Sequence, residues 1–178
     1  MKKIVVGSGI IVCLFAVVLY CISLSRFARP GIYVWAEKTP LYNVQLWAKK
    51  NTPKNTLFIV PPSKWWLYDM EWRVVSERST IVTFSEILEA AFDPDYIKYW
   101  KPRFEDVAPG ALIQFKGNLQ ENMNISSKAY YNNTAKQFSS LAKKYKASYL
   151  VIEKKLQTQK YIFPILYENI EYIIYSLQ

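Results

Sequence analysis

The longest apolar stretch of the chain is near its N-terminus, where residues 4–25 contain no charged side chain. About 20 apolar residues are enough for a helix to cross a bilayer, so this stretch predicts a membrane span. A cleaved secretory signal is the alternative, since Ser23 and Ser25 are small enough to precede a cleavage site. We expect three parts: a transmembrane helix (signal anchor) over residues 1–25, a juxtamembrane linker over 26–39 and a soluble domain over 40–178.

Behind the span, short apolar runs predict strands. Leu57–Val60 is wholly apolar, which is typical of a strand that is buried on both faces of a sheet. Pro61 and Pro62 end this strand, because proline has no N–H to donate to a ladder. The predicted strands are residues 57–60, 79–84 and 149–152, followed by a C-terminal hairpin of 161–167 and 172–177.

Helical spacing of apolar side chains predicts three helices between these strands. They are a helix from Pro40, a helix from Asp93-Pro94 that kinks or stops at Pro102, and an amphipathic helix over 131–145. Residues 111–128 show no clear pattern, apart from an extended piece around Leu112–Phe115. The elements predict an α/β fold, a single-domain mixed sheet with flanking helices and a C-terminal β-hairpin, behind one N-terminal transmembrane helix. We expect one common core that contains Phe58, Val60, Ile81, Phe138, Leu141, Leu150 and Ile152.

The formal charge of +9 points to an anionic neighbour. Lys2 and Lys3 precede the span, which leaves +7 behind it. Such an excess suits anionic lipid headgroups or an acidic polymer, although a solvated basic surface without a partner is the simpler alternative. Nucleic acid is not expected, since no recognition motif accompanies the charge. Positive charges flank the span on both sides, and we expect the N-terminus in the cytoplasm and the domain outside, on the periplasmic or cell-surface side.

The amino-acid content excludes several catalytic classes. The chain has no histidine, and both cysteines, Cys13 and Cys21, lie inside the predicted span. Sites built on Ser-His-Asp, Cys-His or a histidine-ligated metal are therefore excluded. The carboxylate pairs Asp93/Asp95 and Glu105/Asp106 are more simply explained by helix ends than by catalysis. We predict no cofactor, no metal and no catalytic residue, and whether the chain is an enzyme stays open.

The candidate binding residues are aromatic rings and guanidinium groups that follow the first strand: Trp65, Trp66, Tyr68, Trp72, Arg73, Arg78 and, further along, Arg103. Aromatic faces hold a sugar ring, and a planar guanidinium recognises phosphate or carboxylate. We therefore predict that residues 61–78 contact a lipid-linked sugar or a membrane partner. The alternatives are internal ion pairs for the arginines, and core packing or a membrane-interface belt for the aromatic residues.

Several segments carry a family resemblance. They are TPKNTLFIVPP (Thr52–Pro62), Glu77-Arg78-Ser79-Thr80, Trp100 with Arg103, and Tyr167-Glu168-Asn169 with Tyr172 and Tyr175. Over residues 40–178 the chain resembles the soluble C-terminal tails, a domain of unknown function, of bacterial polytopic membrane proteins distantly similar to GT-C glycosyltransferases. The resemblance implies an extracytoplasmic α/β domain. It implies no activity, because the catalytic carboxylate of GT-C enzymes lies in a loop between spans that this chain lacks.

We therefore expect a membrane-anchored, non-catalytic extracytoplasmic domain that binds a partner protein, for instance a polytopic membrane protein, or a glycan-lipid. The alternatives are a part of a GT-C-like glycosyltransferase system and a carboxylate-based hydrolase. The most informative observation would be a concave site at the carboxyl ends of Leu57–Val60 and Thr80–Phe84, since open α/β sheets hold ligands there. A deep pocket lined by paired carboxylates would favour an enzyme.

The predicted span can be tested on the full chain. We expect residues 4–25 to remain uncleaved, so that the protein stays in the membrane pellet after carbonate extraction and N-terminal sequencing starts at or near Met1. A soluble mature protein that starts after Ser25 would contradict the prediction.

Overall fold

The computed structural model describes residues 15–20, 39–62 and 71–178. Its contacts divide the chain into two units, Met1–Glu37 and Lys38–Gln178. In the first unit, residues 15–20 are helical and lie inside the predicted span. Within the described ranges no helix is both long and apolar enough to cross a membrane. The rest of the predicted span and nearly all of the predicted linker lie outside the described residues, so the span stays a prediction.

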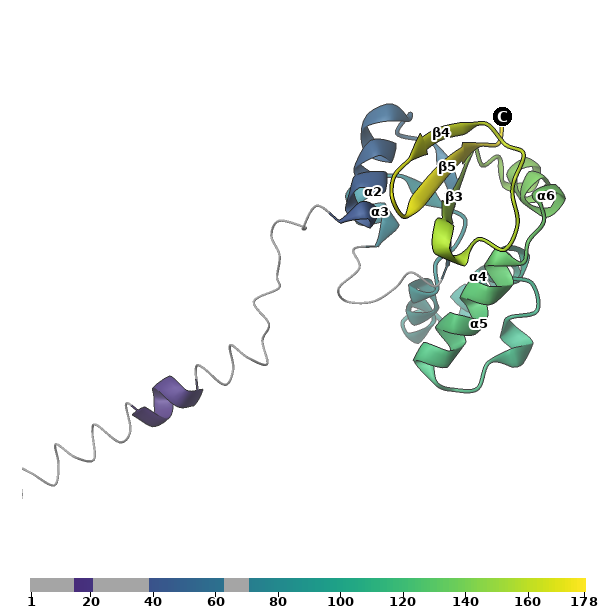
Figure 1. The fold of residues 1–178 in the computed structure, drawn as a ribbon. Helices are drawn as coiled ribbons and strands as arrows, with labels where there is room; N and C mark the ends of the chain where they lie inside the picture. Colours follow the sequence, from purple (N-terminus) through teal and green to yellow (C-terminus); the bar gives the residue numbers. More distant parts are fainter. Residues whose placement is uncertain (1–14, 21–38, 63–70) are drawn as a thin grey trace, which may run out of the picture. The chain divides into compact units, whose positions relative to one another are not determined.

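The second unit is built on a five-stranded mixed sheet in the order β2-β1-β3-β5-β4 (Figure 1). β1 pairs in parallel with β2 on one side and with β3 on the other, whereas β5 is antiparallel to both β3 and β4. The strands are β1 (Leu57–Ile59), β2 (Ser79–Thr80), β3 (Tyr149–Glu153), β4 (Ile165–Glu168) and β5 (Tyr172–Ser176). The predicted α/β class, the mixed sheet and the C-terminal hairpin are confirmed.

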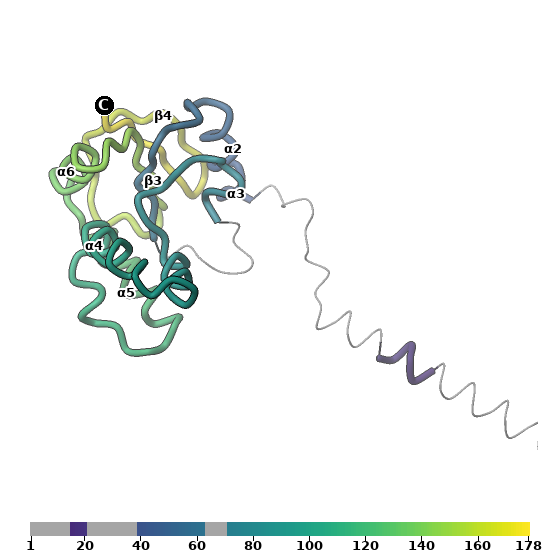
Figure 2. Tube along the Cα trace, turned by 180° about the vertical axis from the view of Figure 1, so that it is seen from behind, coloured from purple at the N-terminus to yellow at the C-terminus, as the bar shows by residue number. Residues whose placement is uncertain are grey.

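Helices cover both faces of the sheet (Figures 1 and 2). α2 (Pro40–Asn51) and α3 (Trp72–Ser76) pack on one face. α4 (Ile97–Val107), α5 (Leu119–Tyr131) and α6 (Ala135–Tyr145) pack on the other. Short 3₁₀ turns join them: η1 (Ser85–Ala91), η2 (Pro94–Tyr96), η3 (Leu112–Gln114) and η4 (Lys154–Leu156).

The core consists of two clusters, one on each side of the sheet. Successive side chains of a strand point to opposite faces, so Phe58 packs toward α2 while Ile59 packs toward α6. All of the predicted core residues are buried. The expectation of one common core is wrong, because Phe58 and Val60 lie in the α2–α3 cluster and the other five in the opposite one. A sheet that is covered on both faces separates them.

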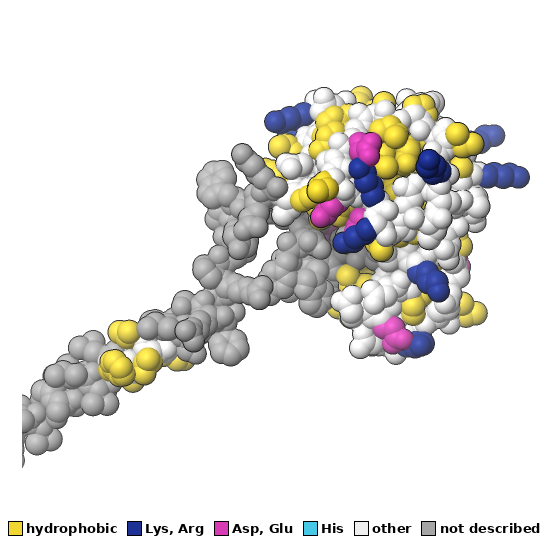
Figure 3. Space-filling view, viewed as in Figure 1, with side chains coloured by type: hydrophobic (Ala, Val, Ile, Leu, Met, Phe, Trp, Pro, Cys, Tyr) yellow, Lys and Arg dark blue, Asp and Glu magenta, His cyan; other side chains and the backbone are white. Residues whose placement is uncertain are grey.

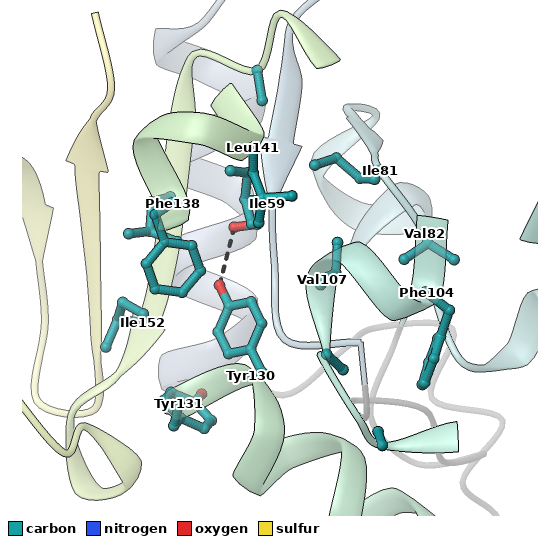
Figure 4. Packing of buried hydrophobic residues seen from close by; sticks show 14 of the residues in the cluster. Ile59, Ile81, Val82, Phe104, Val107, Tyr130, Tyr131, Phe138, Leu141 and Ile152 are labelled. Carbon is teal, nitrogen blue, oxygen red and sulfur yellow. Dashed lines mark hydrogen bonds between the residues drawn. The ribbon is translucent and has the colours of Figure 1, made fainter. Parts of the chain in front are cut away.

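The larger cluster centres on Tyr130 of α5 and Phe138 of α6 (Figure 4). Their ring centroids lie 5.3 Å apart, edge to face. The Tyr130 hydroxyl donates to the carbonyl oxygen of Val151 at 2.8 Å and lies 3.4 Å from that of Ile59, the contact drawn in Figure 4. Complete burial raises the pKa of Tyr130 well above its ordinary value. This side chain thus joins α5 to two neighbouring strands, β1 and β3.

The strand predicted over residues 79–84 is too long. β2 ends at Thr80, although Ile81 and Val82 are buried in the larger cluster. Its partner β1 ends at Ile59, shortly before Pro61 and Pro62, which have no N–H to extend a ladder. β2 therefore stops where its neighbour stops, and the apolar residues behind it are buried by the helices instead.

Of the two predicted effects of Pro102, a stop is wrong, since α4 contains Pro102 and ends at Val107. Proline inside a helix costs about 3 kcal/mol, chiefly through a lost hydrogen bond. Trp100 and Phe104 stack at 4.5 Å between ring centroids and are almost completely buried. Burial of two large aromatic side chains offsets that cost. The predicted start is confirmed, because the Asp93 side chain caps the 3₁₀ turn η2 that leads into α4.

The segment without a clear pattern, residues 111–128, contains most of a helix. η3 replaces the predicted extended piece, and α5 follows with the Asn118 side chain accepting from the Glu121 N–H at 3.0 Å. α6 starts at Ala135, four residues later than predicted, because Thr134 and Gln137 form a capping box at its N-terminus. Tyr131 consequently belongs to α5.

Phe138 tests the packing of α6 on the sheet. Phe138→Ala should lower the free energy of unfolding by about 3–5 kcal/mol, because the side chain is fully buried and its loss leaves a cavity. Ser139→Ala, at an exposed position of the same helix, is the control and should change it by less than about 0.5 kcal/mol. Urea denaturation of both variants measures the difference, and equal stabilities would place this side of α6 outside the core.

Candidate functional site

A small pocket lies at the carboxyl end of β1, on the α2–α3 side of the sheet. Its volume is about 20 Å³, which is room for one water-sized group. Val60 and Pro61 come directly after β1, Thr83 follows β2, and α2 and α3 form the opposite wall. The full lining is Leu41, Gln45, Val60, Pro61, Glu71, Trp72, Thr83, Val151 and Tyr172. The pocket thus lies at the edge of the sheet where a concave site was looked for.

The sheet topology explains why a pocket forms here. The chain leaves β1, passes through α3 to β2 on one side, and returns through α6 to β3 on the other side of β1. The two connections lie on opposite faces, as the two clusters show. Parallel strands whose connections diverge in this way leave a crevice at their carboxyl ends, where α/β proteins bind ligands.

Trp72 gives the pocket its distinctive chemistry. The indole ring is 6% exposed and packs on Phe58, with 5.1 Å between the ring centroids. Among the described residues no acceptor lies within hydrogen-bond distance of its buried Nε1–H. A buried donor without an acceptor costs about 1–3 kcal/mol, so a ligand oxygen at this position is favoured. The structure describes four of the seven predicted binding residues. Of these four, Trp72 alone lines the pocket.

Arg73 is held within the fold. Its guanidinium forms an ion pair with the buried carboxylate of Glu86 and donates to the Thr80 hydroxyl at 3.0 Å. The other Glu86 oxygen accepts from the Tyr96 hydroxyl at 3.2 Å. Burial and the neighbouring Glu86 carboxylate raise the pKa of Tyr96. Arg73 thus joins α3 to η1 and follows the predicted alternative of an internal ion pair.

Arg78 is buried and binds backbone carbonyl groups. Its Nη2 donates to the carbonyl oxygens of Lys49 and Thr52, both at 2.6 Å, and its Nε donates to the Thr52 hydroxyl at 3.0 Å. Its Nη1 donates to the Glu77 carbonyl oxygen at 3.1 Å. The guanidinium satisfies carbonyl groups that the end of α2 leaves unpaired, and its charge complements the helix dipole. Its role is to fix α2.

Arg103 is the last of the described candidates, and it does not line the pocket. Arg103 lies on α4, where its Nε donates to the Tyr99 carbonyl oxygen at 2.9 Å and its guanidinium carbon is 6.0 Å from the centroid of the Tyr96 ring. Trp65, Trp66 and Tyr68 lie outside the described residues. The prediction of a contact surface over residues 61–78 is therefore untested, except that Pro61, Glu71 and Trp72 line the pocket.

Each candidate carboxylate has a structural partner. Asp93 caps η2, Asp95 pairs with Lys98 at 2.6 Å, and Glu105 accepts from the Gly110 N–H at 2.5 Å. Asp106 accepts from the Tyr145 hydroxyl and pairs with Lys144. In the ranges that the structure describes, no three His, Cys, Asp or Glu side chains are grouped to hold a metal ion.

The family match falls on the part of the chain that forms most of this pocket. A family described as Domain of unknown function (DUF6798) matches residues 40–107. Those residues resemble an uncharacterised domain. The match extends from the first residue of α2 to the last of α4, and it includes seven of the nine pocket residues, all except Val151 and Tyr172. Neither the curated proteins nor the solved structures contain a match to the chain.

Sequence reasoning missed Gln45 and Tyr172, which line the pocket from α2 and β5. Gln45 is 2% exposed. A glutamine within the apolar face of a predicted helix is the signal that could have found it, because buried polar side chains are uncommon and need a partner. Tyr172 is brought to the pocket by the antiparallel return of β5, which no local pattern reveals.

A substitution of Arg78 tests whether its guanidinium stabilises the fold. Arg78→Met keeps most of the side-chain volume but leaves several carbonyl groups without donors, so the free energy of unfolding should fall by about 3 kcal/mol or more. Arg103→Met, which removes a half-buried guanidinium with one backbone acceptor, should cost less than about 1 kcal/mol. Thermal or urea unfolding measures both. An Arg78→Met protein as stable as the wild type would contradict the structural role of the guanidinium.

Proposed function

We propose that this chain is a membrane-anchored, non-catalytic extracytoplasmic domain that binds a partner protein or a glycan-lipid at the pocket behind β1. The anchor is supported by the uncharged run of residues 4–25. The binding role is supported by one observation above all. A buried Trp72 indole N–H without an acceptor among the described residues lines a pocket at the ligand-binding edge of an α/β sheet.

The pocket suits a small oxygen-bearing group. Its volume admits about one sugar hydroxyl or one carbonyl oxygen, either of which accepts from the indole N–H. Apolar side chains, including Leu41 and Val60, form much of the wall around that donor. Such a site recognises one projecting group of a larger ligand, with the remainder of the ligand lying on the surface around the opening. Both a glycan and a protein segment carry groups of this kind.

A catalytic alternative receives no support from the geometry of the described residues. A hydrolase that uses two carboxylates requires them to face each other across a cleft. Asp93 instead caps η2, Asp95 and Asp106 form ion pairs, and Glu105 accepts from the Gly110 N–H. Glu71 is the carboxylate that lines the pocket. We therefore propose binding without catalysis.

Trp72→Phe tests the role of the pocket, because it removes the N–H donor and keeps an aromatic ring. Titration of the full chain in detergent with a short-chain polyprenyl-phosphate sugar should give saturable binding, which Trp72→Phe weakens by about threefold to tenfold through the loss of one hydrogen bond. Trp47→Phe is the matched control. Trp47 lies on α2, stacks on Tyr167 and does not line the pocket, so this variant should bind like the wild type.

The same variants test whether the ligand is a partner protein. A photo-reactive amino acid in place of Leu41, at the pocket wall, should form a protein adduct in cells if the ligand is a partner protein. Trp72→Phe should reduce that adduct and Trp47→Phe should not. Absence of both sugar binding and a Trp72-dependent adduct would contradict the proposed function.

A further inference from the structure

The strongest concentration of charge in the domain lies away from the pocket. Between residues 128 and 160 the chain has eight lysines and a single acidic residue, Glu153. Three of the lysines form ion pairs: Lys144 with Asp106, Lys154 with Glu168, and Lys155 with Glu153. None of the ion pairs within the described ranges includes the other five, which are Lys128, Lys136, Lys143, Lys146 and Lys160.

Three of these five lysines share the outer side of α6. The helix buries Phe138, Leu141 and Ala142 against the sheet. Lys136 and Lys143 are seven residues apart, which is two helical turns, so both project from the same exposed face. Lys146 follows at the C-cap and is also exposed. Lysine and arginine side chains protrude at the edge of the domain where α6 lies (Figures 1 and 3). We call Lys136, Lys143 and Lys146 the α6 lysine face.

We infer that the α6 lysine face docks on an anionic phospholipid surface. The charge of this face is complementary to lipid headgroups, and each lysine near such a surface strengthens binding several-fold at low salt. The composition favours lipid over nucleic acid. All eight cations between residues 128 and 160 are lysines, and the exposed residues between Lys136 and Lys143 include Ser139 and Ser140 rather than aromatic platforms. Mobile ammonium groups match a diffuse layer of phosphates.

The inference rests on the proposed function for one point, the anchor that holds the domain beside a bilayer. The contact through α6 also affects which ligand can reach the pocket. The pocket is on the α2–α3 side of the sheet, whereas α6 packs on the opposite side. Docking through α6 therefore turns the pocket away from the lipid, toward a partner protein in the surrounding space.

Amine acetylation of the full chain, read by mass spectrometry, tests the contact. The protein is placed in nanodiscs of phosphatidylcholine alone, or of phosphatidylcholine mixed with anionic phosphatidylglycerol. Acetylation of Lys136, Lys143 and Lys146 should slow at least threefold in the anionic nanodiscs and recover at high salt, because salt screens surface charge. Three exposed lysines outside the ion pairs of the described residues are internal controls and should react equally in both lipids: Lys50, Lys54 and Lys101.

Two variants with the same change of net charge separate the face from the overall charge. Contact with anionic lipid should also slow amide hydrogen exchange along α6, and Lys136→Gln/Lys143→Gln/Lys146→Gln should abolish this slowing. Lys50→Gln/Lys54→Gln/Lys101→Gln should retain it.

Each outcome is decisive. Equal acetylation in the two nanodiscs, with the protein retained in both, overturns the α6 contact and leaves the proposed anchor intact. Retention in anionic nanodiscs alone, with α6 protected, supports the contact and counts against the anchor. Retention in neither overturns both. Protection by an added RNA oligonucleotide, without protection by anionic lipid, overturns the lipid contact and assigns the face to nucleic acid.

Discussion

A buried guanidinium holds together the part of the fold that forms the pocket. Arg78 donates to carbonyl oxygens at the end of α2 and also to the carbonyl oxygen of Glu77, the residue that ends α3 in a left-handed backbone conformation with φ 52°. One charged side chain thereby satisfies acceptors from two helices and the connection to β2. A buried cation without such partners costs several kcal/mol, so the position of α2 relative to β2 is tightly constrained. The pocket depends on this constraint, because α2 supplies one of its walls.

The second determinant is the two-sided sheet. β1 is only three residues long, yet it lies between β2 and β3 and packs on helices at both faces. Pro61 and Pro62 end the ladder at the carboxyl end of β1, where residues that follow β1 and residues of β3 and α2 line the pocket. The crevice is therefore a consequence of the sheet topology. Trp72 lines it, and the indole N–H of this residue has no acceptor among the described residues.

The pocket and the main excess of positive charge lie apart on the domain. The pocket is bordered mainly by apolar side chains on one side of the sheet, and the α6 lysine face lies on the other. α4 and the 3₁₀ turns before it carry carboxylates that pair with lysines, for example Asp95 with Lys98 of α4 and Asp106 with Lys144 of α6. The excess positive charge thus gathers where fewest acids are present, rather than being spread over the surface. The proposed ligand and the proposed lipid contact would therefore lie on opposite sides of the sheet.

The sequence by itself determined the elements whose patterns are local. The apolar run Leu57–Val60 identified a strand buried on both faces, Pro40 marked the start of α2, and the polar turn after Glu168 identified the hairpin. Element order also indicated the carboxyl ends of the first two strands as the place to look for a concave site, because open α/β sheets bind ligands there. Tertiary structure decided the rest. Pro102 stays inside α4 because Trp100 and Phe104 are buried around it, and Arg78 binds carbonyl groups because α2 ends beside it. Which side of the sheet each side chain faces, and that Trp72 and Gln45 meet at one pocket, depends on contacts between residues far apart in the chain, which local patterns do not encode.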